Sequence, residues 1–175
     1  CGRGSKDNKN NIVRNLNFVS KKMLIKRKNL ILMHQTHSNR VFEIKKDNYK
    51  SRVKSDAIIT KMRGIALGVV TADCAPILLY DKKSKIIASI HAGWKGAFSG
   101  IINKTVLRMN KLNPKGEIFA CVGPCIGKSS YEVGYEFFNL FMNKSKRNRI
   151  YFHNKSKNKK FFNLRMFVAD ILKKL

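Results

Sequence analysis

The sequence predicts a single domain of the α+β class. Its 175 residues are enough for one substantial hydrophobic core and too few for two. A hydrophobic share of 43% is typical of a globular chain rather than a disordered one. Helical and strand-like blocks follow one another without an internal repeat and without regular strand–helix–strand units, so α+β is favoured over a parallel α/β sheet.

The first half of the chain is predicted to contain one helix followed by strands. Apolar residues at helical spacing, from Ile12 to Val19, predict an amphipathic helix over residues 11–23. β-Branched and apolar runs then predict strands over residues 30–33, 41–44, 56–60, 65–71, 76–80 and 86–91. Because residues 81–84 have turn composition, the last two of these strands are expected to form a hairpin.

The second half is predicted to be mainly helical. The helices are expected at residues 98–110, 132–142 and 164–175, the last with Asn163 as its N-cap. A strand over residues 117–122 and a loop over 123–127 separate the first two helices. The segment 144–160 holds eight Lys or Arg residues and no acid, which predicts a mobile, solvated surface loop that continues to residue 162.

The chain is strongly basic, with 37 Lys or Arg against 10 Asp or Glu and a net charge of +27. Such a charge can indicate nucleic acid or an anionic surface as a partner. However, residues 56–81 carry two cations and three anions, so the excess lies outside the central motifs described below. We therefore favour a solvated basic surface, with a functional polyanion site as the alternative. No specific nucleic acid is expected, because the interleaving of aromatic and basic residues found in RNA-binding modules is missing.

The cysteines and apolar runs indicate a reduced, cytoplasmic protein without a membrane segment. Four cysteines occur, but a chain of this size needs no disulfide staples, and no signal peptide is visible. The longest apolar runs, such as residues 77–80, are far too short to span a bilayer. The pair Cys121 and Cys125 has the spacing C-x₃-C, for which a packed Cys121 is favoured over a redox pair.

Three short motifs contain residues that suit a metal ion. They are Gln35-Thr36-His37, Thr71-Ala72-Asp73-Cys74-Ala75-Pro76 and His91-Ala92-Gly93-Trp94-Lys95-Gly96. The two imidazoles of His37 and His91 and the thiolate of Cys74 suit zinc, with copper as a competitor. Three protein ligands leave a fourth position open, as in catalytic zinc sites. The predicted hairpin would bring Cys74 and His91 side by side. The alternative is that each residue serves packing or a local hydrogen bond.

These motifs resemble the YfiH/laccase-domain family, also called polyphenol oxidase, peptidoglycan editing factor, or purine nucleoside phosphorylase of the laccase-domain type. The resemblance also covers the stretches 56–60, 64–74, 123–127 (Gly-Pro-Cys-Ile-Gly) and 131–134 (Tyr-Glu-Val-Gly), in family order. It implies that His37, Cys74 and His91 are the metal ligands. It also implies a layered α-β-β-α domain of the cytotoxic necrotising factor-like type, over residues 1–175. Family members extend beyond both ends, so we expect the chain to be a fragment truncated at each end.

The resemblance implies an enzyme of purine nucleoside metabolism. The expected reactions are phosphorolysis of adenosine, inosine and methylthioadenosine, and deamination of adenosine, with small-molecule nucleosides and phosphate as the partners of a monomer. A copper-dependent phenol oxidase is a weaker alternative, because four histidines cannot fill three copper centres. A peptidoglycan editing hydrolase is a further role known among relatives, and a basic nucleic-acid-binding module is the alternative that is not an enzyme.

Further residues near the motifs are candidates for catalysis or substrate binding. Asp73 and Cys74 are the catalytic candidates, Asp73 as a general acid/base or as a partner that orients His37 or His91. Lys95 and Arg40 are candidates for binding phosphate, and Cys125 is a candidate nucleophile or substrate contact. Trp94 and Tyr131 could stack on a purine. For each of these, a cap, a packed side chain or a solvated cation is the structural alternative.

Overall fold

The computed structural model describes all residues except 1, 3–4, 50–52, 155 and 157–158. Its centre is a five-stranded sheet with the order β2-β3-β6-β5-β7. The strands are β2 (Val41–Ile44), β3 (Ala57–Thr60), β5 (Ala75–Asp81), β6 (Ile87–Ala92) and β7 (Ile118–Val122). Only β2 and β3 pair in parallel; the other neighbours are antiparallel. The expected hairpin is confirmed as β5–β6.

A second, smaller sheet lies between the central sheet and the first helix. It consists of β1 (Leu30–Leu32) and β4 (Ala66–Gly68), which pair in parallel. Because side chains alternate along a strand, Leu30 packs towards α1 (Lys9–Lys22), where it meets Ile12 and Leu16. Ile31 points the other way and packs with Ile58 of the central sheet. The strand predicted over residues 65–71 ends at Gly68.

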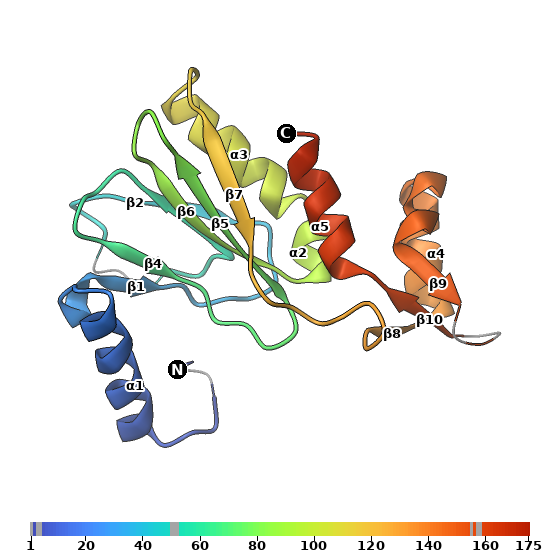
Figure 1. Ribbon diagram of the computed structural model, residues 1–175, viewed down its shortest axis with the longest axis horizontal. Coiled ribbons are helices and arrows are strands. Elements are labelled where there is room, and N and C mark those ends of the chain that lie inside the picture. The colour runs from blue at the N-terminus through green and yellow to red at the C-terminus, as the bar shows by residue number, and fades with distance from the viewer. Residues whose placement is uncertain (1, 3–4, 50–52, 155, 157–158) are drawn as a thin grey trace.

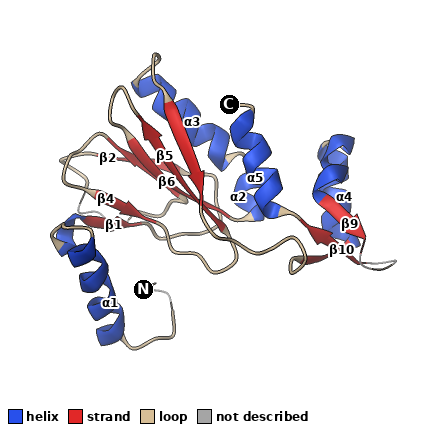
Figure 2. Cartoon of the chain, in the orientation of Figure 1, coloured by secondary structure: helices blue, strands red, loops and turns tan. Residues whose placement is uncertain are grey.

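The opposite face of the central sheet is covered by helices. They are α2 (Trp94–Phe98), α3 (Ile101–Leu112) and α5 (Leu164–Lys173). Figures 1 and 2 show the order of the layers: α1, the β1–β4 sheet, the central sheet, then α3 and α5. The prediction of an α+β fold with α-β-β-α layers is thus confirmed.

The helix predicted over residues 98–110 is wrong at its start. One helix ends at Phe98 and a new one begins at Ile101. Gly100 between them has φ +90°, a left-handed conformation that interrupts a right-handed helix and that glycine adopts at little cost. The apolar face of α3, with Ile102, Val106 and Met109, is buried as expected.

The region after residue 131 differs most from the prediction. Its elements are β8 (Glu132–Gly134), α4 (Tyr135–Lys144), the 3₁₀ helix η2 (Lys146–Tyr151), β9 (Phe152–Asn154) and β10 (Lys159–Phe162). The helix predicted over 132–142 begins three residues later, because Glu132–Gly134 pairs with β10. The order of this small sheet is β8-β10-β9.

The prediction of a loop over residues 144–160 is wrong for most of the described residues, which form the end of α4, η2, β9 and the start of β10. Tyr151 is buried and packs against Phe167 of α5. Phe152 and Phe162 pack against Phe141 of α4, with ring centroids 5.4 and 5.0 Å apart. Aromatic side chains therefore anchor this segment on α4 and α5, whereas its basic side chains are mostly exposed, as the predicted solvated surface requires. Residues 155, 157 and 158 lie outside the described part.

A buried carboxylate closes the β5–β6 turn. Asp81 is 1% exposed and accepts hydrogen bonds from the backbone N–H groups of Lys83 and Glu117. It also accepts from the side chains of Ser84 and Asn113. Burial alone would raise the pKa of Asp81, but these donors outweigh burial and hold its pKa well below the usual range. Asp81 thus ties the turn to the loop between α3 and β7.

None of the helices among the described residues is both long and apolar enough to cross a bilayer. The cysteines of the described part, Cys74, Cys121 and Cys125, are all free thiols.

Candidate metal centre

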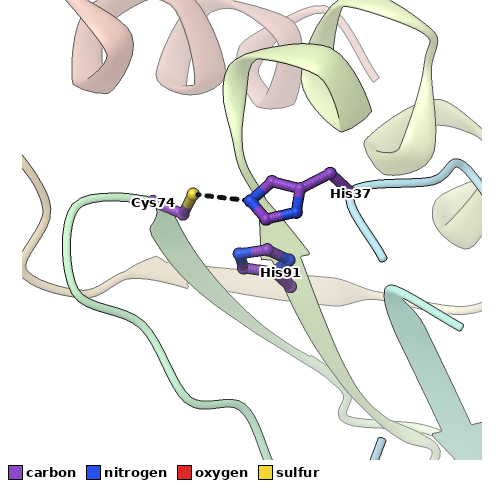
Figure 3. A group of neighbouring side chains, drawn as sticks. All are labelled: His37, Cys74 and His91. Atoms are coloured by element: carbon purple, nitrogen blue, oxygen red, sulfur yellow. Dashed lines mark hydrogen bonds between the residues drawn. The ribbon is translucent and has the colours of Figure 1, made fainter. Parts of the chain in front are cut away.

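Three separate segments bring His37, Cys74 and His91 together. His37 lies in the loop between β1 and β2, Cys74 directly precedes β5, and His91 lies within β6. In the β5–β6 pairing, Pro76 is opposite His91 and Ala75 is opposite Ala92, so the hairpin places Cys74 at the end of the sheet where His91 emerges. Figure 3 shows the three side chains facing one another.

The three side chains are close enough to share one ion. Their potential ligand atoms all lie within 4.8 Å of one another. Cys74 Sγ is 3.7 Å from His37 Nε2, and the two imidazole rings meet edge to face with centroids 4.8 Å apart. His91 is buried, Cys74 is half-buried and His37 is exposed. The cluster is therefore held firmly on the side of the sheet and open to solvent on the side of the His37 loop.

Asp56 holds the cluster in place through hydrogen bonds, a role that the sequence analysis did not assign to it. This fully buried carboxylate directly precedes β3, and its Oδ1 lies 2.8 Å from His91 Nδ1. Because a carboxylate only accepts, Nδ1 carries the hydrogen, which leaves Nε2 of His91 as the nitrogen available to a metal. Asp73 was a candidate partner to orient His37 or His91. Among the described residues its carboxylate makes no hydrogen bond to either histidine, and Asp56 takes that place at His91.

The same carboxylate fixes the loop that carries His37. Thr36, His37 and Ser38 all donate backbone N–H groups to Asp56, His37 at 2.9 Å and Ser38 at 2.7 Å. The Ser38 hydroxyl donates a further bond of 2.6 Å. His37 itself has φ +57°, a left-handed conformation that is uncommon for a residue other than glycine. The hydrogen bonds to Asp56 hold this strained backbone in place.

The Asp56–His91 contact changes the proton affinity of both groups. Burial lowers the pKa of His91, but the hydrogen bonds to Asp56 and Cys74 and the charges of both raise it, to about 9. Burial likewise would raise the pKa of Asp56, yet the donors from His91, Ser38 and Thr36 hold it well below its usual range. At neutral pH Asp56 is therefore an anion, and a metal ion binding at His91 Nε2 would replace a proton.

Gly93 is needed for the close approach of Cys74 and His37. A Cβ atom at position 93 would lie 2.9 Å from Cys74 Sγ and 3.0 Å from His37 Cδ2, closer than such atoms normally come. The backbone of Gly93, with φ −67° and ψ 163°, is one that any residue can adopt. The lack of a side chain at position 93 therefore leaves room for Cys74 and His37, and the backbone conformation there does not require glycine.

Replacing Gly93 by alanine should therefore weaken metal binding without unfolding the chain. The added methyl group has to displace the thiolate of Cys74 or the ring of His37, and we expect a loss of metal affinity of about tenfold, as for other changes next to metal ligands. Competition with a chromophoric chelator measures this affinity. The matched control is Gly134→Ala, because Gly134 has a similar φ of −75° and a Cβ there would meet nothing within 4 Å. Equal affinities in the two variants would contradict the steric role of Gly93.

Three other candidate residues lie around the cluster. Asp73 is exposed, and its backbone carbonyl accepts a hydrogen bond of 2.9 Å from Ile126, which joins the 123–127 loop to the Cys74 loop. Burial raises the pKa of Tyr131 to about 12, with further contributions from the charges of Cys74 and Asp73. Burial also raises the pKa of the Cys125 thiol; the charge of Arg165 opposes this effect, and the charge of Cys74 adds to it. Cys125 and Tyr131 thus both lie within electrostatic reach of Cys74.

The contacts of the remaining candidates are with groups outside the cluster. Trp94 packs edge to face on Phe137 of α4, with centroids 4.7 Å apart, so its ring is engaged in the core. Lys95 is exposed, and its ammonium group lies 5.6 Å from the centroid of the Trp94 ring. Arg40 is exposed and lines a cleft whose walls include none of the three clustered residues.

The layered scaffold and the cluster define a class: an α+β domain in which a loop and a hairpin present two imidazoles and a thiolate to one position. The chain belongs to the family described as multi-copper polyphenol oxidoreductase laccase, which it matches over residues 1–175. The resemblance seen in the motifs is thereby confirmed.

Curated relatives and solved structures agree with this assignment. A purine nucleoside phosphorylase of Rickettsia conorii is 33% identical over 170 residues, which cover 94% of this chain and 70% of the relative. An adenosine deaminase from an unknown prokaryotic organism, RL5, is 36% identical over 121 residues, covering 64% of this chain and 46% of that protein. Other relatives are matched over less of their length, for example 59% of a purine nucleoside phosphorylase of Rickettsia prowazekii, which is 34% identical and is matched over 82% of this chain.

The fold is shared with proteins of known structure. The Neisseria meningitidis protein NMB0706 has a TM-score of 0.87 at 28% identity, over 99% of this chain and 69% of its own. The YfiH protein of Bacillus licheniformis has a TM-score of 0.89 at 23% identity, over 99% of this chain and 69% of its own, and shows likeness of fold.

Proposed function

We propose that this chain carries the metal centre of a purine nucleoside enzyme. Its reactions are phosphorolysis of adenosine, inosine and methylthioadenosine, and deamination of adenosine. The observation that carries the proposal is the convergence of His37, Cys74 and His91 around a position that Gly93 keeps free. The relatives named purine nucleoside phosphorylase and adenosine deaminase indicate the substrate class.

The donor set fits zinc, with copper as the second choice. Two imidazoles and one thiolate are borderline-to-soft ligands, and Asp56 fixes which nitrogen of His91 is free to bind. Bound by these three residues, zinc would supply Lewis acidity towards an oxygen of water or substrate at its open position. The thiols of the described cysteines are free, which suits a reduced, cytoplasmic setting.

The residues around the cluster can handle the substrate. In deamination, water adds at C6 of the purine and ammonia leaves, so a group must move a proton; the exposed carboxylate of Asp73, next to Cys74, is suited to that step. Tyr131 stays protonated and can donate a hydrogen bond to the purine or ribose, because its pKa is raised to about 12. Cys125 lies within electrostatic reach of Cys74 and is proposed as a substrate contact.

Phosphorolysis needs a cation that holds the second substrate. A phosphate oxygen attacks C1′ of the ribose, the bond from C1′ to the purine nitrogen breaks, and the purine leaves with a proton. We assign Lys95 to the phosphate, because it is an exposed cation four residues beyond His91. Arg40 is less suited, since the cleft that it lines does not include the cluster.

A phenol oxidase with several copper centres finds no support in the described residues. The sequence has four histidines, and neither His34 nor His153 joins the cluster of His37, Cys74 and His91. Within the part of the chain that the structure describes, this cluster therefore suits a single ion.

Product analysis with adenosine and inorganic phosphate tests the proposal. The metal-loaded protein should release adenine and ribose 1-phosphate and convert some adenosine to inosine. His91→Ala should abolish both activities, because it removes a ligand. Lys95→Ala should reduce phosphorolysis, by about ten- to a hundredfold, more than deamination, because only phosphorolysis needs the anion. Equal losses in both reactions would reject Lys95 as the phosphate contact, and no turnover of any purine nucleoside would reject the reaction class.

A further inference from the structure

A cleft of about 730 Å³ begins two residues after His37 in the sequence, at Asn39, and includes none of the three clustered residues in its lining. It follows β2, which is an edge strand of the central sheet, and its wall is completed by α3. Its volume is within the range of small-molecule sites. The activity proposed above makes no use of it.

The cleft concentrates positive charge in excess of its acids. Five basic residues line it, from four different segments of the chain: Arg40, Lys45, Lys54, Lys104 and Arg108. The acids in its lining are Glu43 and Asp47. Lys104 and Arg108 lie one turn apart on α3 and therefore on the same face of that helix.

Only part of this charge is neutralised. Glu43 binds Arg108 at 2.8 Å and approaches Lys45 at 3.9 Å. Among the described residues, no ion pair is formed by Arg40, Lys54 or Lys104.

The three cations without an ion pair are the donors that the cleft offers. Arg40, Lys54 and Lys104 come from two loops and from α3, so they face one hollow from different sides. Guanidinium and ammonium groups around a hollow are donors from which phosphate oxygens accept. The lining residue Ser55 is 1% exposed and its hydroxyl is buried in the wall, so recognition in the cleft depends on the cations.

We propose that this cleft binds a polyphosphate chain, either free or as part of a nucleotide. Arg40, Lys54 and Lys104 pair with the phosphate oxygens. The site is distinct from the metal centre, because none of the clustered residues lines it. It is nevertheless joined to that centre through the backbone, since the carbonyl of Arg40 accepts from the N–H groups of Asp56 and Ala57.

Calorimetric titration with tripolyphosphate, ATP and adenosine near physiological salt tests this site. The test variant is Lys54→Gln with Lys104→Gln. The matched control is Lys111→Gln with Lys115→Gln, which removes the same charge from exposed lysines that do not line the cleft. We expect tripolyphosphate to bind about tenfold or more weakly to the test variant and unchanged to the control. Circular dichroism confirms that both variants are folded.

The outcomes distinguish binding in the cleft from non-specific binding to the basic surface and from binding at the metal centre. Equal weakening in the two variants, or no saturable binding to the unaltered protein, overturns the proposal. Binding that disappears in Cys74→Ser also overturns it, because the phosphate would then sit at the metal centre. ATP that binds like tripolyphosphate supports a site for the phosphate chain alone, whereas tighter binding of ATP supports a nucleotide. Adenosine turnover at the metal centre is measured separately, and it should be unchanged in the variant that lacks Lys54 and Lys104, because neither lysine belongs to the cluster.

Discussion

Cys74→Ser is expected to remove nearly all of the bound metal, which we expect at about one ion per chain in the unaltered protein. A hydroxyl is uncharged at neutral pH and is a poor ligand for zinc or copper, whereas a thiolate binds both strongly. His37 and His91 alone then share the ion, so we expect the affinity to fall by more than the roughly ten- to hundredfold seen when only an outer partner is changed. Elemental analysis for zinc and copper, after dialysis under reducing conditions, measures the content.

Cys121→Ser is the matched control for this experiment. Cys121 lies on β7, is exposed, and is not part of the cluster, so its loss should leave the metal content unchanged. Unchanged zinc and copper in Cys74→Ser would reject the assignment of Cys74 as a ligand. Equal losses in both variants would show that thiol chemistry elsewhere, and not the cluster, binds the metal.

Asp56→Asn is expected to damage both stability and metal binding. An amide has one acceptor oxygen and turns an NH₂ group towards donors that Thr36, Ser38 and His91 already present to the carboxylate. Unsatisfied donors in a buried position cost about 1–3 kcal/mol each, so the free energy of unfolding should fall by roughly 2–4 kcal/mol. Metal affinity should fall by about ten- to a hundredfold, because His37 and His91 lose their support. Urea unfolding and chelator competition measure the two effects.

Asp81→Asn is the control that separates the loss of stability from the loss of metal affinity. Asp81 is an equally buried carboxylate with several donors, but it lies at the turn of the hairpin, at the opposite end of β5 from Cys74. Its loss should cost stability and leave metal affinity unchanged. Because the pKa of Asp81 is lowered in the folded state, its stabilisation is complete above about pH 4, the ordinary range of the unfolded carboxyl, and declines as the pH falls further. If Asp56→Asn keeps full metal affinity, Asp56 has only a structural role.

The sequence predicted the central fold well because local signals and tertiary pairing agree there. The β5–β6 hairpin combines two β-branched runs with a turn-forming segment, and the helix over 101–112 has a clear apolar face. The prediction failed where pairing or packing with residues far away in the sequence determines the local structure. Glu132–Gly134 reads as the start of a helix but pairs with β10, more than twenty residues later in the chain. The basic segment after Lys144 reads as solvated, yet its aromatic residues pack on α4.

The candidate ligands could be found from the sequence, but their support could not. His37, Cys74 and His91 each stand in a recognisable motif, and the hairpin already suggested that two of them meet. Asp56 stood at the start of a predicted strand and of the motif stretch 56–60, and no role was assigned to it. Its partners lie 18–20 residues earlier and 35 residues later, and nothing local distinguishes it from a surface aspartate. Burial next to a histidine is visible only in three dimensions.

The wide separation of the three clustered residues has a thermodynamic consequence. His37, Cys74 and His91 approach one another only when the β1–β2 loop and the β5–β6 hairpin have assembled, so an unfolded chain offers no comparable set of ligands. A metal ion that binds this set binds the native state alone and shifts the folding equilibrium towards it. At free metal a hundredfold above the dissociation constant, this shift is about 2.7 kcal/mol. Melting temperature should therefore rise with metal concentration, and chelators should act on this protein as mild denaturants.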